Sequence, residues 1–160
     1  MKMTDQNQKS YVQNIKNHLV SQNIINRKNI YVFDQIMDLI VTDVEVYTND
    51  LKSIMTCGAL WDTGATYCLV SDNMISRLNL HPINQVKTSN AAGDMITDLY
   101  SIGISIPNFA SFGDVFAIRS GMKDYDLIIG MNLIKQGDFS INNYGGKTTF
   151  SFTYPPEPSE

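Results

Sequence analysis

The sequence GALWDTGAT occupies residues 58–66, where an apolar run carries directly into an acid, a hydroxyl and a glycine. A buried carboxylate must be paired or protonated, so an acid seldom ends an apolar strand without a reason. Gly64 supplies the backbone freedom for a tight turn directly after Asp62, and the hydroxyl of Thr63 can satisfy polar groups around it. The stretch predicts either an ordinary strand that ends in a turn or a strand that presents Asp62 for chemistry.

A second stretch, DLIIGMNLI, occupies residues 126–134. It consists of an apolar run, a glycine and a segment that suits a short helix. Taken alone, it indicates a buried strand followed by a helix, and periodicity cannot say more. Together with the first stretch, which lies upstream of it, it has a second interpretation, given next.

The two stretches together resemble the two signature segments of the retropepsin-like (retroviral-type) aspartic proteases, and the chain is similar to a bacterial-type single-domain member of that family. The resemblance covers about residues 38–153, and Ala65 and residues 69–71 strengthen it. It implies an all-β fold, with a small closed β-barrel of the acid-protease (retropepsin) type, a flap hairpin, one or two short helices and an extra N-terminal helix. It also implies an aspartic endopeptidase, in which the segment around Gly130 passes beside the catalytic loop and supports it.

Peptide hydrolysis in this family uses two carboxylates that face one water and share a proton, because two such groups about 3 Å apart cannot both ionise. The sequence contains one Asp-Thr-Gly, so a pair of carboxylates requires a C2 homodimer that places Asp62 of each subunit opposite its mate. By resemblance, Thr63 hydrogen-bonds across that axis. The residues expected to be catalytic are Asp62, Thr63 and Gly64, and those expected to bind a peptide or protein substrate are Ala65, Thr66, Ala92, Gly93, Asp94 and Ile129.

The sequence departs from the retroviral pattern beside both signature segments. Retroviral members usually place an acid after Asp-Thr-Gly-Ala and an arginine after the glycine of the second segment, and the two pair. This sequence has Thr66 and Met131 there, so no lone charge is stranded, which would be costly. We therefore expect the loop to be braced differently. Trp61 is also bulkier than the family's usual aliphatic residue, and we expect it to pack under the loop.

The composition is that of one ordinary globular domain: 160 residues, 43% apolar, 18% charged, with a net charge of −4. It gives no indication of nucleic-acid binding, and no apolar run reaches the length of a membrane span. The first ten residues lack the apolar region of a signal peptide, so we expect a cytoplasmic protein with Cys57 and Cys68 as buried free thiols. Neither His18 nor His81 has companion ligands, so we expect no metal and no other cofactor.

Two further segments carry predictions. An amphipathic pattern predicts a helix over residues 9–25, whose apolar face packs on its own domain, on a partner subunit or on another protein. Residues 86–100 predict a hairpin with its tip at residues 91–94, and by position this matches the flap that closes over a substrate. The expected organisation is an N-terminal helical extension (1–37), a retropepsin-like protease domain (38–153) and a flexible tail (154–160).

The assembly expected from the resemblance uses the chain ends, which the family commonly interleaves beneath the active site. Here this implicates residues 147–153, whose Phe150 and Phe152 share one strand face. Two alternatives stay open: the fold serves as a non-catalytic peptide-binding or dimerisation module, or the chain stays monomeric until a partner or condition assembles it. The intact Asp-Thr-Gly favours catalysis.

Overall fold

A computed structural model describes residues 28–90 and 93–156, which form short strands joined by turns. The predicted helix over residues 9–25 lies outside the described residues, as do Ala91, Ala92 and residues 157–160. The strands are β1 (Lys28–Val32), β2 (Val41–Tyr47), β3 (Ile54–Trp61), β4 (Cys68–Ser71), β5 (Asn84–Asn90), β6 (Gly93–Ile106), β7 (Ala110–Ser120), β8 (Leu127–Ile129), β9 (Asp138–Asn142) and β10 (Thr149–Thr153), and the helices are α2 (Asp72–Leu78), α3 (Met131–Ile134) and the 3-10 turn η1 (Tyr144–Gly146).

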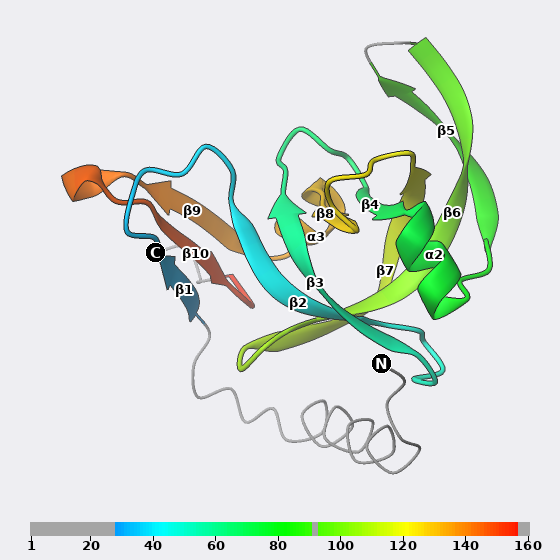
Figure 1. Cartoon of the computed structure of the whole chain (residues 1–160), viewed down its shortest axis with the longest axis horizontal. Helices are drawn as coiled ribbons and strands as arrows, with labels where there is room; N and C mark the ends of the chain where they lie inside the picture. The colour runs from blue at the N-terminus through cyan, green and yellow to red at the C-terminus, as the bar shows by residue number, and fades with distance from the viewer. Residues whose placement is uncertain (1–27, 91–92, 157–160) are drawn as a thin grey trace.

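Six strands close into a barrel in the order β2-β3-β8-β4-β7-β6, because β2 also pairs with β6 (Figure 1). Burial alternates along the strands, as in β2, where Val44 and Val46 are fully buried and Asp43 is exposed. This period of two turns one face of each strand toward a common core. Closure also removes the unpaired edges that an open sheet would carry. The predicted all-β fold with a small closed barrel is confirmed.

The helix α2 packs against β3 and β4. Ser71 is its N-cap, and its side-chain oxygen accepts a hydrogen bond from the Met74 N–H at 3.0 Å. Asn79 ends the helix in the left-handed conformation, which asparagine tolerates better than most residues. Met74 and Leu78 are buried in the core.

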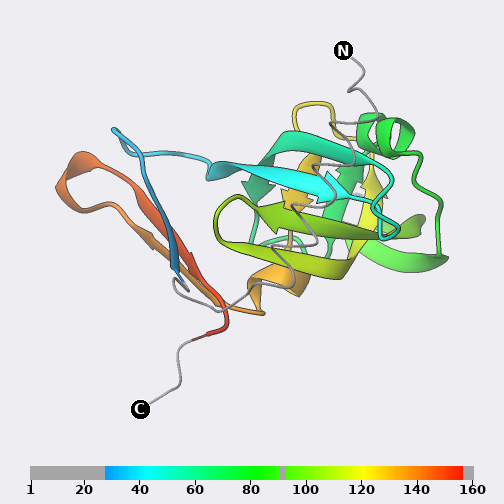
Figure 2. The ribbon, with the colours of Figure 1, turned by 90° about the horizontal axis from the view of Figure 1, so that it is seen from below.

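The three-stranded sheet β1-β10-β9 lies beside the barrel and joins the two ends of the described chain (Figure 2). Its central strand β10 pairs with both neighbours, and Phe150 and Phe152 are fully buried. Their rings lie 4.9 and 5.1 Å from the ring of Trp61, measured between centroids. The expectation that this face of residues 147–153 holds a dimer is therefore wrong: it is part of the core of its own chain.

The predicted hairpin is formed by β5 and the first half of β6, and it projects away from the barrel (Figure 1). The second half of β6 belongs to the barrel wall and pairs with β2 and β7. A register shift between Ile102 and Ile104 marks the middle of that half. Gly103 is required there, because a Cβ atom would lie 1.9 Å from the ring of Tyr47.

Candidate active site

Asp62 follows β3 directly, where this strand runs parallel to β8 in the barrel wall. Its backbone N–H donates to the carbonyl oxygen of Ile129 at 3.0 Å. The end of β3 is therefore fixed to the end of β8 at the acid itself. The two signature segments of the sequence are neighbours in space, as the resemblance implied.

The turn after Asp62 orients its carboxylate. The Gly64 N–H donates to Asp62 Oδ1 at 2.8 Å, and the Ala65 N–H donates to the Asp62 carbonyl at 3.3 Å. A Cβ atom at Gly64 would lie 3.1 Å from the same Oδ1, tighter than ordinary contact. A glycine thus suits the position where the backbone approaches the acid, and the predicted role of Gly64 next to Asp62 has a geometric basis.

The far side of the loop is braced by backbone hydrogen bonds in place of the ion pair that the sequence lacks. The Met131 N–H donates to the Ala65 carbonyl at 2.7 Å, and the Asn132 N–H donates to the Thr66 carbonyl at 3.0 Å. At Gly130, a Cβ atom would lie 2.2 Å from the carbonyl oxygen of Tyr67. The loop and the segment around Gly130 are therefore in direct backbone contact.

Asn132 adds a side-chain brace that sequence reasoning missed. Its Oδ1 accepts the Cys68 N–H at 2.9 Å, and its Nδ2 donates to the Phe116 carbonyl at 2.7 Å. One amide thus joins α3, β4 and β7 behind the loop. The sequence did contain a signal for this role, namely an asparagine early in the expected helix after Gly130. An asparagine side chain competes with the backbone for helical hydrogen bonds, so its presence there indicates that it bonds to another part of the chain.

Both cysteines are free, as expected, but the expectation that both are buried is wrong for Cys57, which is only partly covered in β3. Cys68 is fully buried, and its Sγ accepts a hydrogen bond from the Gly130 N–H at 3.5 Å. Burial raises the pKa of Cys68 to about 11, against the smaller opposite effect of that hydrogen bond. Burial, together with Asp126 and Asp43, raises the pKa of Cys57 to about 12. Both groups are therefore neutral thiols near pH 7.

Trp61 anchors the base of the loop from the core side. It is 6% exposed and packs against Phe150 and Phe152 of the terminal sheet. Its indole Nε1 donates to the hydroxyl of the buried Thr42 at 2.9 Å. The position before the acid is thus fixed by packing and a hydrogen bond, which gives the unusual tryptophan a structural role.

A cleft of about 380 Å³ opens beside Asp62, between the loop, the hairpin and the ends of β4 and β7. Of the residues predicted to form the site, Asp62, Gly64, Ala65 and Thr66 line it. The other lining residues, which sequence reasoning did not single out for binding, are Tyr67, Leu69, Thr88, Ser89, Met95, Ile118, Arg119, Ser120, Gly121 and Ile128.

The other predicted residues lie elsewhere. Thr63 is exposed outside the cleft lining, and Ile129 is fully buried, so Ile128 lines the cleft instead. Gly93 and Asp94 are exposed on the hairpin, also outside the lining, and Ala92 is outside the described residues. The alternation along a strand explains the exchange of Ile129 for Ile128, because neighbouring side chains face opposite sides.

The side chain of Asp94 is engaged across the hairpin. It forms an ion pair with Lys87 and accepts a hydrogen bond from the Ser89 hydroxyl. The hydrogen bond from Lys87, followed by that from Ser89, holds the pKa of Asp94 below its usual value. Asp94 therefore serves the cross-strand pairing of β5 and β6.

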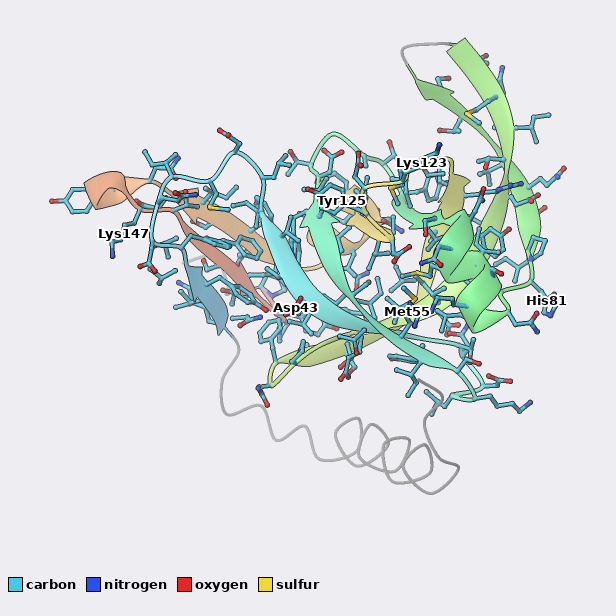
Figure 3. All side chains as sticks on the ribbon, in the orientation of Figure 1. Asp43, Met55, His81, Lys123, Tyr125 and Lys147 are labelled. Atoms are coloured by element: carbon cyan, nitrogen blue, oxygen red, sulfur yellow. The ribbon has the colours of Figure 1, made fainter. Side chains whose placement is uncertain are left out.

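Within residues 28–90 and 93–156, no three His, Cys, Asp or Glu side chains are grouped so that they could hold a metal ion. His81 lies on the outer side of α2, away from Lys123 and Tyr125 (Figure 3). No helix in this part of the chain is long and apolar enough to cross a membrane.

Comparison with known proteins identifies the fold. No protein-family model and no curated protein matches the sequence. The structure is similar to the crystal structure of a retropepsin-like aspartic protease from Rickettsia conorii, with 13% identity, 78% of this chain and 92% of that chain covered, and a TM-score of 0.52. It also matches the EIAV protease, with 15% identity, 72% and 91% coverage and a TM-score of 0.45. The chain has a retropepsin-like fold.

Proposed function

We propose that the protein is an aspartic endopeptidase, in which two Asp62 carboxylates, one from each subunit of a homodimer, activate the water that attacks a peptide bond. The observation that carries this proposal is the placement of Asp62: at the end of a barrel strand, oriented by the Gly64 N–H, and open to a cleft on a retropepsin-like fold. The two free thiols suit the reducing environment of the cytoplasm, where we place the enzyme.

The chemistry needs one ionised and one protonated carboxyl. The ionised group removes a proton from the water, and the protonated group donates a hydrogen bond to the carbonyl oxygen of the scissile bond. Like charges at hydrogen-bond distance cannot both persist, so the pair shares a proton. The chain has one Asp-Thr-Gly, and a two-fold axis beside Asp62 supplies the second copy.

Two exposed apolar side chains, Ile36 and Leu39, lie in a segment beside the loop and support this assembly. Residues 33–40 connect β1 to β2, on the same side of the molecule as the loop after β3 (Figure 1). The Trp61 N–H donates to the Ile40 carbonyl at 2.9 Å, so the segment contacts the residue next to Asp62. Ile36 and Leu39 are nevertheless 56% and 49% exposed.

The backbone of this segment is held firmly. The segment is tied to Thr148, which is fully buried. The Thr148 carbonyl accepts the Phe33 N–H at 2.8 Å, and the Thr148 N–H donates to the Gln35 carbonyl at 3.0 Å. The Thr148 hydroxyl accepts the Met37 N–H at 2.9 Å. Ile36 and Leu39 are therefore presented by an anchored backbone. We propose that a second copy of the chain, docked about an axis at Asp62, covers these two side chains.

Asp62→Asn is expected to lower the rate of peptide cleavage by about 10⁴-fold or more. A single acid–base group typically contributes about 10²–10⁴-fold, and this substitution removes both catalytic carboxylates. Cleavage of an unstructured protein is measured beside circular dichroism and sedimentation, which should show an unchanged fold and oligomeric state. Full cleavage by the folded variant would exclude the mechanism, and peptide binding by a wild-type protein that never cleaves would favour a binding module instead.

Ile36→Asp is expected to weaken the dimer, with Ile83→Asp as the matched control. Ile83 is also 56% exposed, but it follows α2 and lies outside residues 33–40. Placing a charge in a buried interface is costly, whereas the same charge in solvent is not. Sedimentation across a hundredfold dilution should show dissociation at higher concentration for Ile36→Asp alone, with a parallel loss of specific activity. Equal behaviour of the two variants would remove this segment from the interface.

A further inference from the structure

Arg119 is the one positively charged residue among those that line the cleft in the described part of the chain, and Asp62 is the one negatively charged residue. Arg119 lies near the end of β7, next to Ser120 and Gly121, which also line the cleft. Its side chain is about half exposed. Arg119 is not needed to neutralise a fully buried charge, since Asp62 is only partly buried and lines the cleft.

The guanidinium is held in place by Asp72, the first residue of α2. Arg119 Nε donates to Asp72 Oδ1 at 2.7 Å, and Nη2 donates to Oδ2 at 3.2 Å. This two-point contact uses two of the five N–H donors of a guanidinium and fixes its plane. Asp72 itself lies outside the cleft lining. The ion pair therefore positions Arg119 through a residue outside the cleft lining and leaves three of the five guanidinium N–H donors outside this contact.

The remaining walls are mostly apolar or carry small hydroxyls. Leu69, Ile118 and Ile128 supply aliphatic surface, and Thr88 and Ser89 supply hydroxyls from the hairpin. Such a pocket suits a side chain with an aliphatic stem and a single acidic end. A carboxylate can bind the free guanidinium donors in the geometry that arginine favours.

We propose that Arg119 binds the carboxylate of a glutamate or aspartate side chain in the bound peptide, so that the protein selects acidic peptide segments. For cleavage this rests on the proposed function. In a C2 dimer the second Arg119 occupies the equivalent place on the other half of the cleft. Cleavage sites should then carry acidic residues at two positions, placed equally far on either side of the scissile bond.

The test separates binding from catalysis by using Asp62→Asn protein, which should keep a peptide intact. Peptides that differ only by Glu or Gln at one position are compared by fluorescence anisotropy. At one peptide position, or at two positions placed symmetrically about the scissile bond, the peptide with Glu should bind about tenfold more tightly than the peptide with Gln. This ratio is the one expected for a hydrogen bond to a charged group. The added substitution Arg119→Gln should abolish that preference, and higher salt should weaken it.

Two controls isolate the guanidinium. Asp72→Asn removes the same ion pair but keeps Arg119, so it should retain a preference for Glu. Lys123→Gln removes one positive charge from the neighbouring loop outside the cleft lining, and should retain the full preference. An unchanged Glu-to-Gln ratio in Arg119→Gln, or the absence of any position that prefers Glu, would overturn the proposal. A clear preference for Glu in a wild-type protein that cleaves no peptide would contradict the proposed protease function, but it would support the acidic-peptide binding site.

Discussion

The two walls of the cleft are built in opposite ways. On the barrel side, the Asp62 loop is tied by backbone hydrogen bonds to Ile129 and to Met131, and Gly130 leaves no room for a side chain behind it. On the hairpin side, Met95 and Ile96 are 44% and 71% exposed.

Charged and amide side chains of the hairpin contact one another across its two strands, between Gln85 and Asp98 and between Asp94 and both Lys87 and Ser89. At the base of the hairpin, the Thr97 hydroxyl donates to the Arg119 carbonyl of β7 at 3.2 Å. Segments with few buried apolar contacts open at low free-energy cost, and well-packed ones do not. The difference shows that this fold holds its carboxylate in a well-braced wall and leaves the opposite wall free to adjust. Substitutions on the two walls should therefore have different consequences.

The largest effect on stability is expected from Gly130→Ala. Its Cβ atom would lie 2.2 Å from a backbone oxygen, and a backbone atom cannot move aside as a flexible side chain does. We expect the free energy of unfolding to fall by about 3 kcal/mol, the upper part of the usual range for overpacking. Peptide cleavage should fall with it, because the shifted segment carries the partner of the Asp62 N–H.

The matched control is Gly113→Ala on the exposed part of β7, where a Cβ atom would meet no atom within 4 Å. Its unfolding midpoint in urea should stay close to that of the wild type, and its activity should be unchanged. A Gly130→Ala protein with the wild-type midpoint would show that the loop is less tightly braced than the contacts indicate.

A second prediction uses the thiol behind the loop. Burial raises the pKa of Cys68 to about 11, from an ordinary value of 9.0. Above pH 9 the unfolded chain therefore releases this proton while the folded chain keeps it, so the unfolded state gains and stability falls as pH rises from 9 to 11. The loss attributable to Cys68 should reach about 2 kcal/mol at pH 11.

Other groups titrate in the same range, so the quantity to measure is the difference in unfolding free energy between wild type and Cys68→Ala at pH 8 and at pH 11. That difference should shift in favour of the variant by the stated amount as the pH rises. A constant difference would mean that Cys68 is open to solvent, and would weaken the picture of a closed, packed wall behind Asp62.

The packed wall is also the part that the sequence predicted well. Asp62, Gly64 and Gly130 belong to short motifs whose geometry is local. The assignment of Phe150 and Phe152 to a dimer failed for a physical reason. An apolar strand face requires burial, but its sequence does not say whether the covering surface belongs to the same chain, and here Trp61 provides it.

The residues that line the cleft were the least predictable part. Arg119 enters the cleft because β7 runs parallel to β4 and pairs Arg119 with Val70, a contact between residues far apart in the sequence. Asn132 joins three elements in the same way. On the hairpin, the expected tip residues Gly93 and Asp94 lie outside the cleft lining, whereas Thr88 and Met95, opposite each other in the register, line it. Such residues follow from strand register, which no short motif records.

The smallest effect on stability is expected on the hairpin, and measuring it directly tests the difference between the two walls of the cleft. Met95 lines the cleft and Ile96, its neighbour in β6, does not, since adjacent strand residues face opposite sides. Both side chains are largely exposed, so Met95→Ala and Ile96→Ala should each change the free energy of unfolding by no more than about 0.5 kcal/mol.

Only Met95→Ala removes apolar surface from the wall that a peptide would contact. It should raise KM severalfold with little change in kcat, because the contact holds the bound peptide in the ground state and the transition state alike. Steady-state cleavage and urea unfolding of the two variants provide the measurement. A large stability loss in either variant would mean that the hairpin is as firmly packed as the Asp62 loop, and equal KM values for both would mean that this face of the hairpin does not meet the substrate.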